Sequence, residues 1–222
     1  MKPVAVFLLM ISAWVASAAD RSPLADVRRY APSIQLDMRY ATARNFTGRP
    51  VTGYMAAKCL LHAPAARALA AAEAALRSRG FGLIIYDCYR PQRAVADFMA
   101  WAKAPDDPVS KSTYYPDLDK SRLVPDYIAE KSGHSKGATA DIGLLDCSAG
   151  QCREVDMGTP FDFFGTQANT DWPGASPAQK ASRKLLLEAM AAQGFVNYPL
   201  EWWHFTWKAG TLPDEAYDFP IE

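Results

Sequence analysis

The chain has 222 residues, half of them hydrophobic, and its 24 basic and 24 acidic side chains give a formal net charge of zero. This length and apolar content suffice for one sizeable hydrophobic core. The balanced charge lacks the basic excess typical of nucleic-acid-binding proteins, so we expect no nucleic-acid partner.

The N-terminal residues follow the pattern of a secretory signal. Lys2 gives a positive start, an apolar stretch runs from Val4 to Val15, and small residues occupy positions 16–19. The alternative is a membrane anchor, but the apolar stretch is shorter than the ~20 residues that span a bilayer. We therefore predict a cleaved signal peptide over residues 1–18, one domain over residues 19–222, a periplasmic or secreted protein, and no stable membrane insertion after cleavage.

Hydrophobic periodicity predicts a strand, a loop and a helix at the start of the domain. The alternation over 34–40 indicates a strand, and the glycines and prolines of 41–54 favour a loop. Alanines and leucines recur at helical spacing over 64–79, with Pro64 at a first-turn position and Gly80 as the C-terminal stop. The alanine-rich stripe of this helix is expected to be core.

A strand-to-helix junction follows. Residues 81–86 form a short apolar run typical of a buried strand, and Pro91 is expected to start the next helix. Because a residue before proline favours an extended backbone, Arg90 lies at the junction, where its guanidinium can point into a cleft. The alternative for Arg90 is a surface ion pair with an acid such as Asp87, and composition alone does not decide between them.

The second half of the chain continues the mixture of helices and strands. Residues 106–125 are polar and contain prolines, which predicts a long loop; a strand is expected over 138–145, a helix over 178–193 stopped by Gly194, and a last strand near 201–207. The aromatic side chains around the last strand are expected to be core rather than a substrate platform. No repeat, low-complexity run or Gly/Ser linker divides the chain. This pattern favours a single α+β domain.

The cysteine count is even, and export favours disulfide bonds. Cys147 and Cys152 enclose a short turn-forming stretch, so we predict that they pair with each other and leave Cys59 to pair with Cys88. A Cys-only zinc site is the competing interpretation, but the usual CxxC pairs are missing from the sequence.

Two of the three histidines lie in short runs that suit a catalytic zinc site, SGHSKGATAD and EWWHF. Zinc binds imidazole nitrogen and carboxylate oxygen, and catalytic sites keep three protein ligands and one open position for water. His134, Asp141 and His204 supply these ligand types. On an unbroken strand His134 and Asp141 would point to opposite faces, so a bend is required between them, and Gly137 can provide it.

Glu201 is the candidate for the uncoordinated carboxylate that takes a proton from water and passes it to the leaving amine. It shares a face with His204 if the segment is helical, whereas in a strand the two side chains point oppositely. The spacing is not that of the HExxH helix of common zinc proteases.

Taken together, the runs YATARNFTG, YRPQRAV, SGHSKGATADIGL, MGTPFDFF and LEWWHF resemble the zinc D-alanyl-D-alanine dipeptidases. The resemblance covers roughly Leu24 to the C-terminus. It implies one zinc ion per chain, a small dipeptide substrate, and a small, mainly antiparallel sheet flanked by helices, with the zinc site in a cleft on the sheet.

The resemblance also implies roles for individual residues. The metal ligands fall on His134, Asp141 and His204, the general base falls on Glu201, and the arginine of YRP, which stabilises the negative oxygen of the attacked carbonyl, falls on Arg90. Residues that hold the substrate fall on Tyr40, Ser132 and Asp162. Tyr40 and Asp162 suit the dipeptide ammonium and Ser132 suits its carboxylate. Loop capping or surface solvation is the alternative for each of these three.

Export and Cys88, where we expect glycine in cytoplasmic members, set this chain apart from the cytoplasmic type. Export would place the enzyme outside the compartment where cell-wall precursors are assembled, so we do not expect a role in antibiotic resistance. It favours hydrolysis of D-alanyl-D-alanine released by cell-wall turnover, for recycling or nutrition. Two other functions stay open. One is a carboxypeptidase or endopeptidase of peptidoglycan stem peptides that uses the same zinc chemistry, and the other is a non-catalytic, zinc-stabilised peptide-binding protein.

Overall fold

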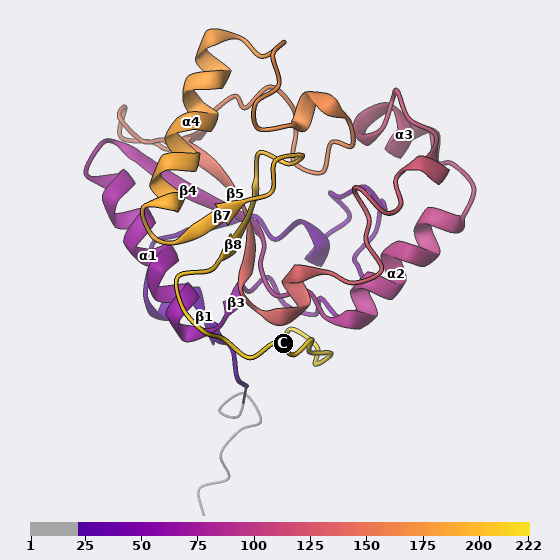
Figure 1. Ribbon diagram of the computed structural model, residues 1–222, viewed down its shortest axis with the longest axis horizontal. Coiled ribbons are helices and arrows are strands. Elements are labelled where there is room, and N and C mark those ends of the chain that lie inside the picture. Colours follow the sequence, from indigo (N-terminus) through magenta and orange to yellow (C-terminus); the bar gives the residue numbers. More distant parts are fainter. Residues whose placement is uncertain (1–21) are drawn as a thin grey trace, which may run out of the picture.

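A six-stranded sheet runs through the centre of the protein in the computed structural model, which describes residues 22–222 (Figure 1). The strand order is β2-β4-β5-β8-β7, and β6 pairs with β5. Only β2 and β4 are parallel; the other neighbouring pairs are antiparallel. The strands of this sheet are β2 (Gln35–Leu36), β4 (Phe81–Asp87), β5 (Thr139–Asp146), β6 (Arg153–Glu154), β7 (Phe195–Asn197) and β8 (His204–Trp207).

Helices cover the sheet from two sides. In Figure 1, α1 and α4 lie to the left of the central strands and α2 and α3 lie to the right. The helices are α1 (Ala63–Arg77), α2 (Gln92–Lys103), α3 (Pro108–Tyr114) and α4 (Pro177–Ala191), and a second, two-stranded sheet is formed by β1 (Ala25–Asp26) and β3 (Leu60–Leu61). The predicted α+β domain with a mainly antiparallel sheet and flanking helices is confirmed.

Helix α1 lies close to the range 64–79 that the helical spacing of alanines and leucines predicts. Its predicted stripe faces the core, with Ala65, Leu69, Ala72 and Leu76 buried. Each buried leucine contributes about 2 kcal/mol by removing its side chain from water. Gly80 follows the helix with a φ of 80°, a left-handed conformation that only glycine adopts without strain, and the chain then enters β4.

Two predicted elements are wrong in part. The strand expected over 34–40 is confined to β2, and a 3-10 helix, η3 (Arg39–Ala41), replaces its second half. The ladder of β2 with β4 ends at the pair of Leu36 and Ile85, so the residues after Leu36 have no regular partner strand.

The polar segment 106–125 was predicted to be a loop but contains α3. Asp107 caps this helix by accepting hydrogen bonds from the backbone N–H groups of Val109 and Ser110, and Pro108 occupies the first turn, where a missing N–H costs nothing. The capping signal is therefore present in the sequence, but the prolines and polar residues around it are equally typical of a loop.

Both predicted disulfides are formed. Cys59 is bonded to Cys88 and Cys147 to Cys152, and residues 22–222 contain no free cysteine. The first bond joins the segment before β3 to the end of β4, and it is fully buried. The second closes the short loop after β5, and a Cys-only metal site is thereby excluded.

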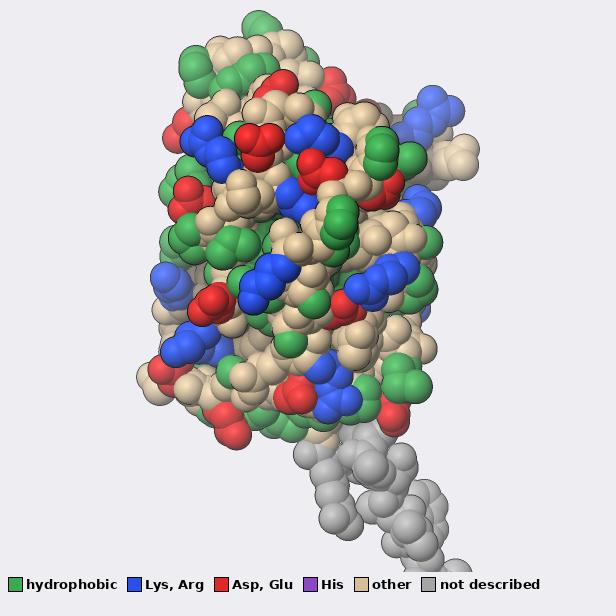
Figure 2. Space-filling view, turned by 90° about the vertical axis from the view of Figure 1, so that its right-hand side faces the viewer, with side chains coloured by type: hydrophobic (Ala, Val, Ile, Leu, Met, Phe, Trp, Pro, Cys, Tyr) green, Lys and Arg blue, Asp and Glu red, His purple; other side chains and the backbone are tan. Residues whose placement is uncertain are grey.

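The predicted signal peptide, residues 1–18, lies outside the described residues. Within residues 22–222, no helix combines the length and the apolar character that crossing a bilayer demands. On the side of the molecule where α2 and α3 lie, Figure 2 shows basic and acidic side chains interspersed, in keeping with the balanced composition.

Candidate metal centre

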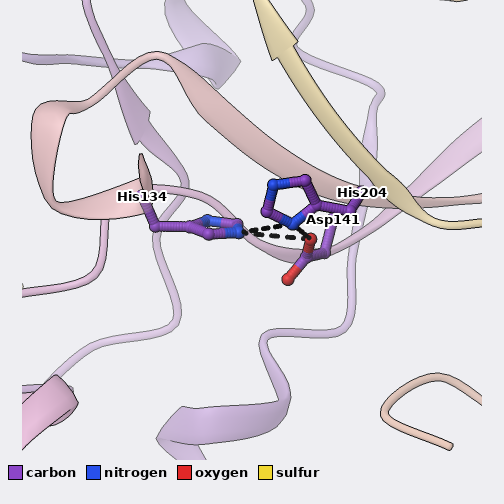
Figure 3. Close-up of side chains that lie close together, drawn as sticks. All are labelled: His134, Asp141 and His204. Atoms are coloured by element: carbon purple, nitrogen blue, oxygen red, sulfur yellow. Dashed lines mark hydrogen bonds and ion pairs between the residues drawn. The ribbon is translucent and has the colours of Figure 1, made fainter. Parts of the chain in front are cut away.

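Three side chains from separate elements converge at one point above the sheet. His134 comes from the 3-10 helix η5 (Gly133–Lys136), Asp141 from β5 and His204 from β8. Asp141 and His204 are register partners in the β5–β8 ladder, which places both on the same face. One potential ligand atom from each residue lies within 4.8 Å of the others (Figure 3). We call these three residues the ligand cluster.

The segment between His134 and Asp141 bends as predicted. Gly137 has a φ of 69° and ends η5, so the chain turns before it enters β5. Ser132 caps the start of η5: its hydroxyl accepts a hydrogen bond of 3.2 Å from the backbone N–H of His134. The capping alternative for Ser132 is therefore real, although the residue also lines the cleft beside the cluster.

The orientation of His134 is set by a backbone group. Its Nδ1 lies 2.6 Å from the carbonyl oxygen of Cys88, to which it donates a hydrogen bond. The proton is thereby placed on Nδ1, and the free electron pair of Nε2 points into the cluster. His134 is almost fully buried, so this arrangement is shielded from competing water.

An unpartnered carboxylate oxygen tests whether the cluster suits a metal ion. Oδ1 of Asp141 is buried and accepts no hydrogen bond, although it lies 3.2 Å from Nε2 of His134 and 3.1 Å from Nδ1 of His204. A buried oxygen without a partner is costly. Two nitrogens and one anionic oxygen aimed at a common point form the donor set that zinc prefers, so the residues fit a divalent ion.

Charge within the cluster favours ionised Asp141. Burial opposes ionisation, but the imidazoles of His134 and His204, when they are protonated at the nitrogens that face the carboxylate, outweigh it and lower the pKa of the Asp141 carboxyl well below its ordinary value. The carboxylate is therefore in the form that binds a cation.

A tight turn brings Glu201 next to His204, so the Glu-x-x-His segment is neither helix nor strand at its start. The backbone N–H of His204 donates to the carbonyl of Glu201 at 3.2 Å, and Oε2 of Glu201 lies 3.5 Å from Nδ1 of His204. The side-chain amide of Asn197 donates to the carbonyl oxygens of both residues at 3.0 Å. Asn197 thus fixes this turn, a role that no sequence pattern indicated.

The surroundings of Glu201 suit a proton carrier. Burial raises the pKa of its carboxyl to about 7, with the negative charge of Asp141 acting in the same direction and the charges of His204 and Arg90 opposing. A group with this pKa can both accept and release a proton near neutral pH.

Arg90 makes the predicted ion pair, but inside the cleft rather than on the surface. Its guanidinium lies 2.9 Å from Oδ2 of Asp87 and 3.5 Å from Oδ2 of Asp141. The rings of Tyr40 and Phe98 lie 5.1 and 5.0 Å from the guanidinium carbon, close enough for cation–π attraction. The positive charge is therefore held rigidly beside the ligand cluster. Asp87, fully buried at the end of β4, is the residue that anchors it.

Tyr40 and Asp162 meet on the other side of the cleft. The Tyr40 hydroxyl donates a hydrogen bond of 2.8 Å to Oδ1 of Asp162, whereas Oδ2 of Asp162 is buried without a partner. Burial and the charge of Asp141 raise the pKa of the Asp162 carboxyl well above its ordinary value, against the hydrogen bond from Tyr40. Asp162 also has a φ of 65°, a strained conformation that is concentrated at functional sites.

All predicted catalytic, ligand and substrate-holding residues line one cleft of about 210 Å³. The structure adds a wall that sequence analysis missed, formed by the segment 125–131 and by Tyr198, whose hydroxyl donates to the carbonyl of Asp126 at 3.2 Å. No motif marked these residues, because they contribute shape and aromatic surface rather than reactive groups. Of the four aromatic residues predicted to be core, Trp202, Trp203 and Phe205 are buried, whereas Trp207 is only partly buried against the core; Trp203 also lines the cleft.

Comparison with known proteins identifies the family of the chain. The sequence profile described as D-ala-D-ala dipeptidase matches residues 20–222. A D-alanyl-D-alanine dipeptidase of Streptomyces coelicolor is 39% identical over 189 residues, which cover 85% of this chain and 93% of that protein. The D-alanyl-D-alanine dipeptidase of Enterococcus faecium is 36% identical, with 85% and 93% covered, and that of Escherichia coli is 34% identical, with 91% of both covered. The chain is therefore an enzyme of the D-ala-D-ala dipeptidase family, a family of metal-dependent peptidases.

Proposed function

We propose that this enzyme hydrolyses D-alanyl-D-alanine to two D-alanines and that one zinc ion is bound by His134, Asp141 and His204. The convergence of the ligand cluster with Glu201 and Arg90 in one cleft carries this proposal. When bound, zinc supplies Lewis acidity and lowers the pKa of a water molecule to about 7. The names of the relatives point to the same substrate.

Glu201 and Arg90 perform the proton and charge chemistry. Glu201 takes the proton from the attacking water and delivers it to the nitrogen of the departing D-alanine, which its pKa of about 7 permits in both directions. The guanidinium of Arg90 faces the oxygen of the attacked carbonyl and stabilises the negative charge that develops there. Because Asp87 and the two aromatic rings hold the guanidinium in advance, little reorganisation is needed in the transition state.

The ends of a free dipeptide are recognised by groups that lack partners without it. The unpartnered Oδ2 of Asp162 suits the ammonium group, with Tyr40 orienting the carboxylate through Oδ1. The hydroxyl hydrogen of Ser132 is free to be donated to the substrate carboxylate, since its oxygen acts as acceptor in the cap. An ammonium bound at Asp162 also stabilises the ionised carboxyl against its burial.

Replacing Asp162 by asparagine is expected to lower kcat/KM for D-alanyl-D-alanine by about 10- to 100-fold, the usual cost of losing a hydrogen bond to a charged group. The effect should be much smaller for N-acetyl-D-alanyl-D-alanine, which has no ammonium. Steady-state kinetics on both peptides measure this difference, with Asp171→Asn, an exposed acid before α4, as the control. An equal loss on both peptides would contradict ammonium recognition.

Release of free D-alanine decides between this function and its alternatives. We expect rapid release from D-alanyl-D-alanine and little hydrolysis of L-alanyl-L-alanine or of a stem pentapeptide. Longer stems lack an ammonium at the required position, so they cannot form the ion pair with Asp162, whose buried carboxyl then stays neutral because its pKa is raised well above its ordinary value. Preferential hydrolysis of the stem would identify a peptidoglycan carboxypeptidase, and binding without release would identify a non-catalytic protein.

We further propose that the enzyme works in the periplasm on dipeptide released by cell-wall turnover. The signal-like residues 1–18 and the two disulfides support export, because disulfides persist in oxidising compartments. Fractionation of the source cells should find the protein outside the cytoplasm and without Met1. A cytosolic protein that begins at Met1 would refute export and leave the enzymatic assignment untouched.

A further inference from the structure

One disulfide contacts the ligand cluster through the backbone. The carbonyl oxygen of Cys88 accepts the 2.6 Å hydrogen bond from Nδ1 of His134, and the side chain of Cys88 is bonded to Cys59. Both cysteines are fully buried. The position of a covalently restrained peptide group therefore determines which nitrogen of His134 carries the proton and where Nε2 points.

The segment that carries Cys59 is connected to both partners of this hydrogen bond. On the acceptor side, the N–H of Tyr89 donates to the carbonyl of Leu60 at 3.0 Å. On the donor side, the N–H of His62 donates to the carbonyl of Gly137 at 2.8 Å, at the end of the 3-10 helix that contains His134. The Tyr89 N–H belongs to the same peptide group as the Cys88 carbonyl, and the disulfide adds a covalent connection that holds this group through the Cys88 side chain.

No neighbouring group among residues 22–222 takes the place of the Cys88 carbonyl. Oδ2 of Asp87 lies 3.5 Å from Nδ1 of His134, beyond good hydrogen-bonding distance, and it already accepts from Nε of Arg90 at 3.0 Å. Oδ1 of Asp87 accepts from the hydroxyl of Tyr54 at 2.7 Å. Both oxygens of Asp87 are therefore engaged, and the orientation of His134 depends on Cys88.

We propose that the Cys59–Cys88 disulfide is a positioning element of the metal centre, which holds the Cys88 carbonyl so that His134 presents Nε2 to the ion. The proposal rests on the metal centre of the proposed function. The second disulfide provides a matched comparison. Cys147 follows the end of β5, about 20 Å along the strand from Asp141, and its bond to Cys152 contacts Arg77 at 3.2 and 3.3 Å rather than the cluster.

The test compares zinc affinity in three proteins: the unmodified chain, C59A/C88A and C147A/C152A. Zinc dissociation constants are measured by competition with a chromophoric chelator, and visible spectra of the Co²⁺-loaded proteins report the ligand geometry. We expect C59A/C88A to bind zinc about 10- to 100-fold more weakly, the usual effect of removing support behind a ligating histidine, with an altered Co²⁺ spectrum. C147A/C152A should keep the affinity and spectrum of the unmodified chain.

Each outcome is decisive. Equal zinc affinity in C59A/C88A and the unmodified chain would overturn the proposal, as would an equal loss in both double variants, because a general loss of stability would then be the cause. Circular dichroism of the metal-free proteins verifies that they fold. If C59A/C88A does not fold, C59V/C88A is tested in its place, because valine fills part of the space of the lost sulfurs. If neither folds, the bond serves the fold and not the site. Failure of the unmodified chain to bind zinc would refute the metal centre itself.

Discussion

Replacing Glu201 by glutamine is expected to lower kcat by about 10²- to 10⁴-fold while leaving bound zinc unchanged. Glutamine has nearly the same shape but cannot take a proton from water, and Glu201 lies outside the ligand cluster. The turn that positions the side chain uses backbone groups and Asn197, so it should survive the substitution. Turnover of D-alanyl-D-alanine and metal content by atomic emission measure the two effects separately.

A matched control for this variant is Glu188→Gln on the exposed surface of α4. It removes the same charge far from the cleft and should retain the full rate. If Glu201→Gln kept normal turnover, another group would have to be the base. Loss of zinc together with activity would instead show that Glu201 is a ligand.

Replacing His204 by alanine is expected to abolish both zinc binding and turnover. Only two ligands from the chain would remain, and Asp141 would be left with one of the two imidazoles that lower its pKa. Loss of the ion removes the activated water, so the residual rate should fall to or below that of Glu201→Gln. The measurements are metal content after dialysis and release of D-alanine with and without added zinc.

His62 is the matched control, because it is the third histidine of the chain and lies before α1 outside the ligand cluster. His62→Ala should keep one zinc per chain. Normal zinc content in the His204 variant would contradict the ligand assignment, and equal loss in both histidine variants would point to a general effect on folding.

Local patterns determined much of the fold. Helix α1 and helix α4 were predicted to within a few residues, because the signals are local: an apolar stripe and a first-turn proline for α1, and a glycine after the end of each helix. Helix α3 was missed because Asp107 and Pro108 look the same in a loop and in a capped first turn. The strand predicted over 34–40 is too long for a different reason: strand pairing is a contact with a distant segment, and the ladder of β2 with β4 ends at Leu36.

The candidate ligands and the candidate base could be predicted from the sequence alone. Zinc binds imidazole and carboxylate groups, and two of the three histidines lie in short runs that also contain an acidic residue. The sequence also indicated the bend at Gly137 and both disulfide pairs. Whether Glu201 and His204 share a face stayed open until the turn between Tyr198 and His204 resolved it.

Only the tertiary structure decided how these groups work together. The hydrogen bond between Tyr40 and Asp162 joins residues 122 positions apart, and the one between Cys88 and His134 joins residues 46 positions apart. The ion pair between Arg90 and Asp87 could be predicted, but only the structure shows that Asp87 is fully buried and that the pair therefore lies inside the cleft. The physical reason is that the signals of a helix and its caps come from residues that are near neighbours in the chain. The burial of an ion pair, the tautomer of a histidine and the lack of a partner for a carboxylate oxygen depend on groups that meet only after folding.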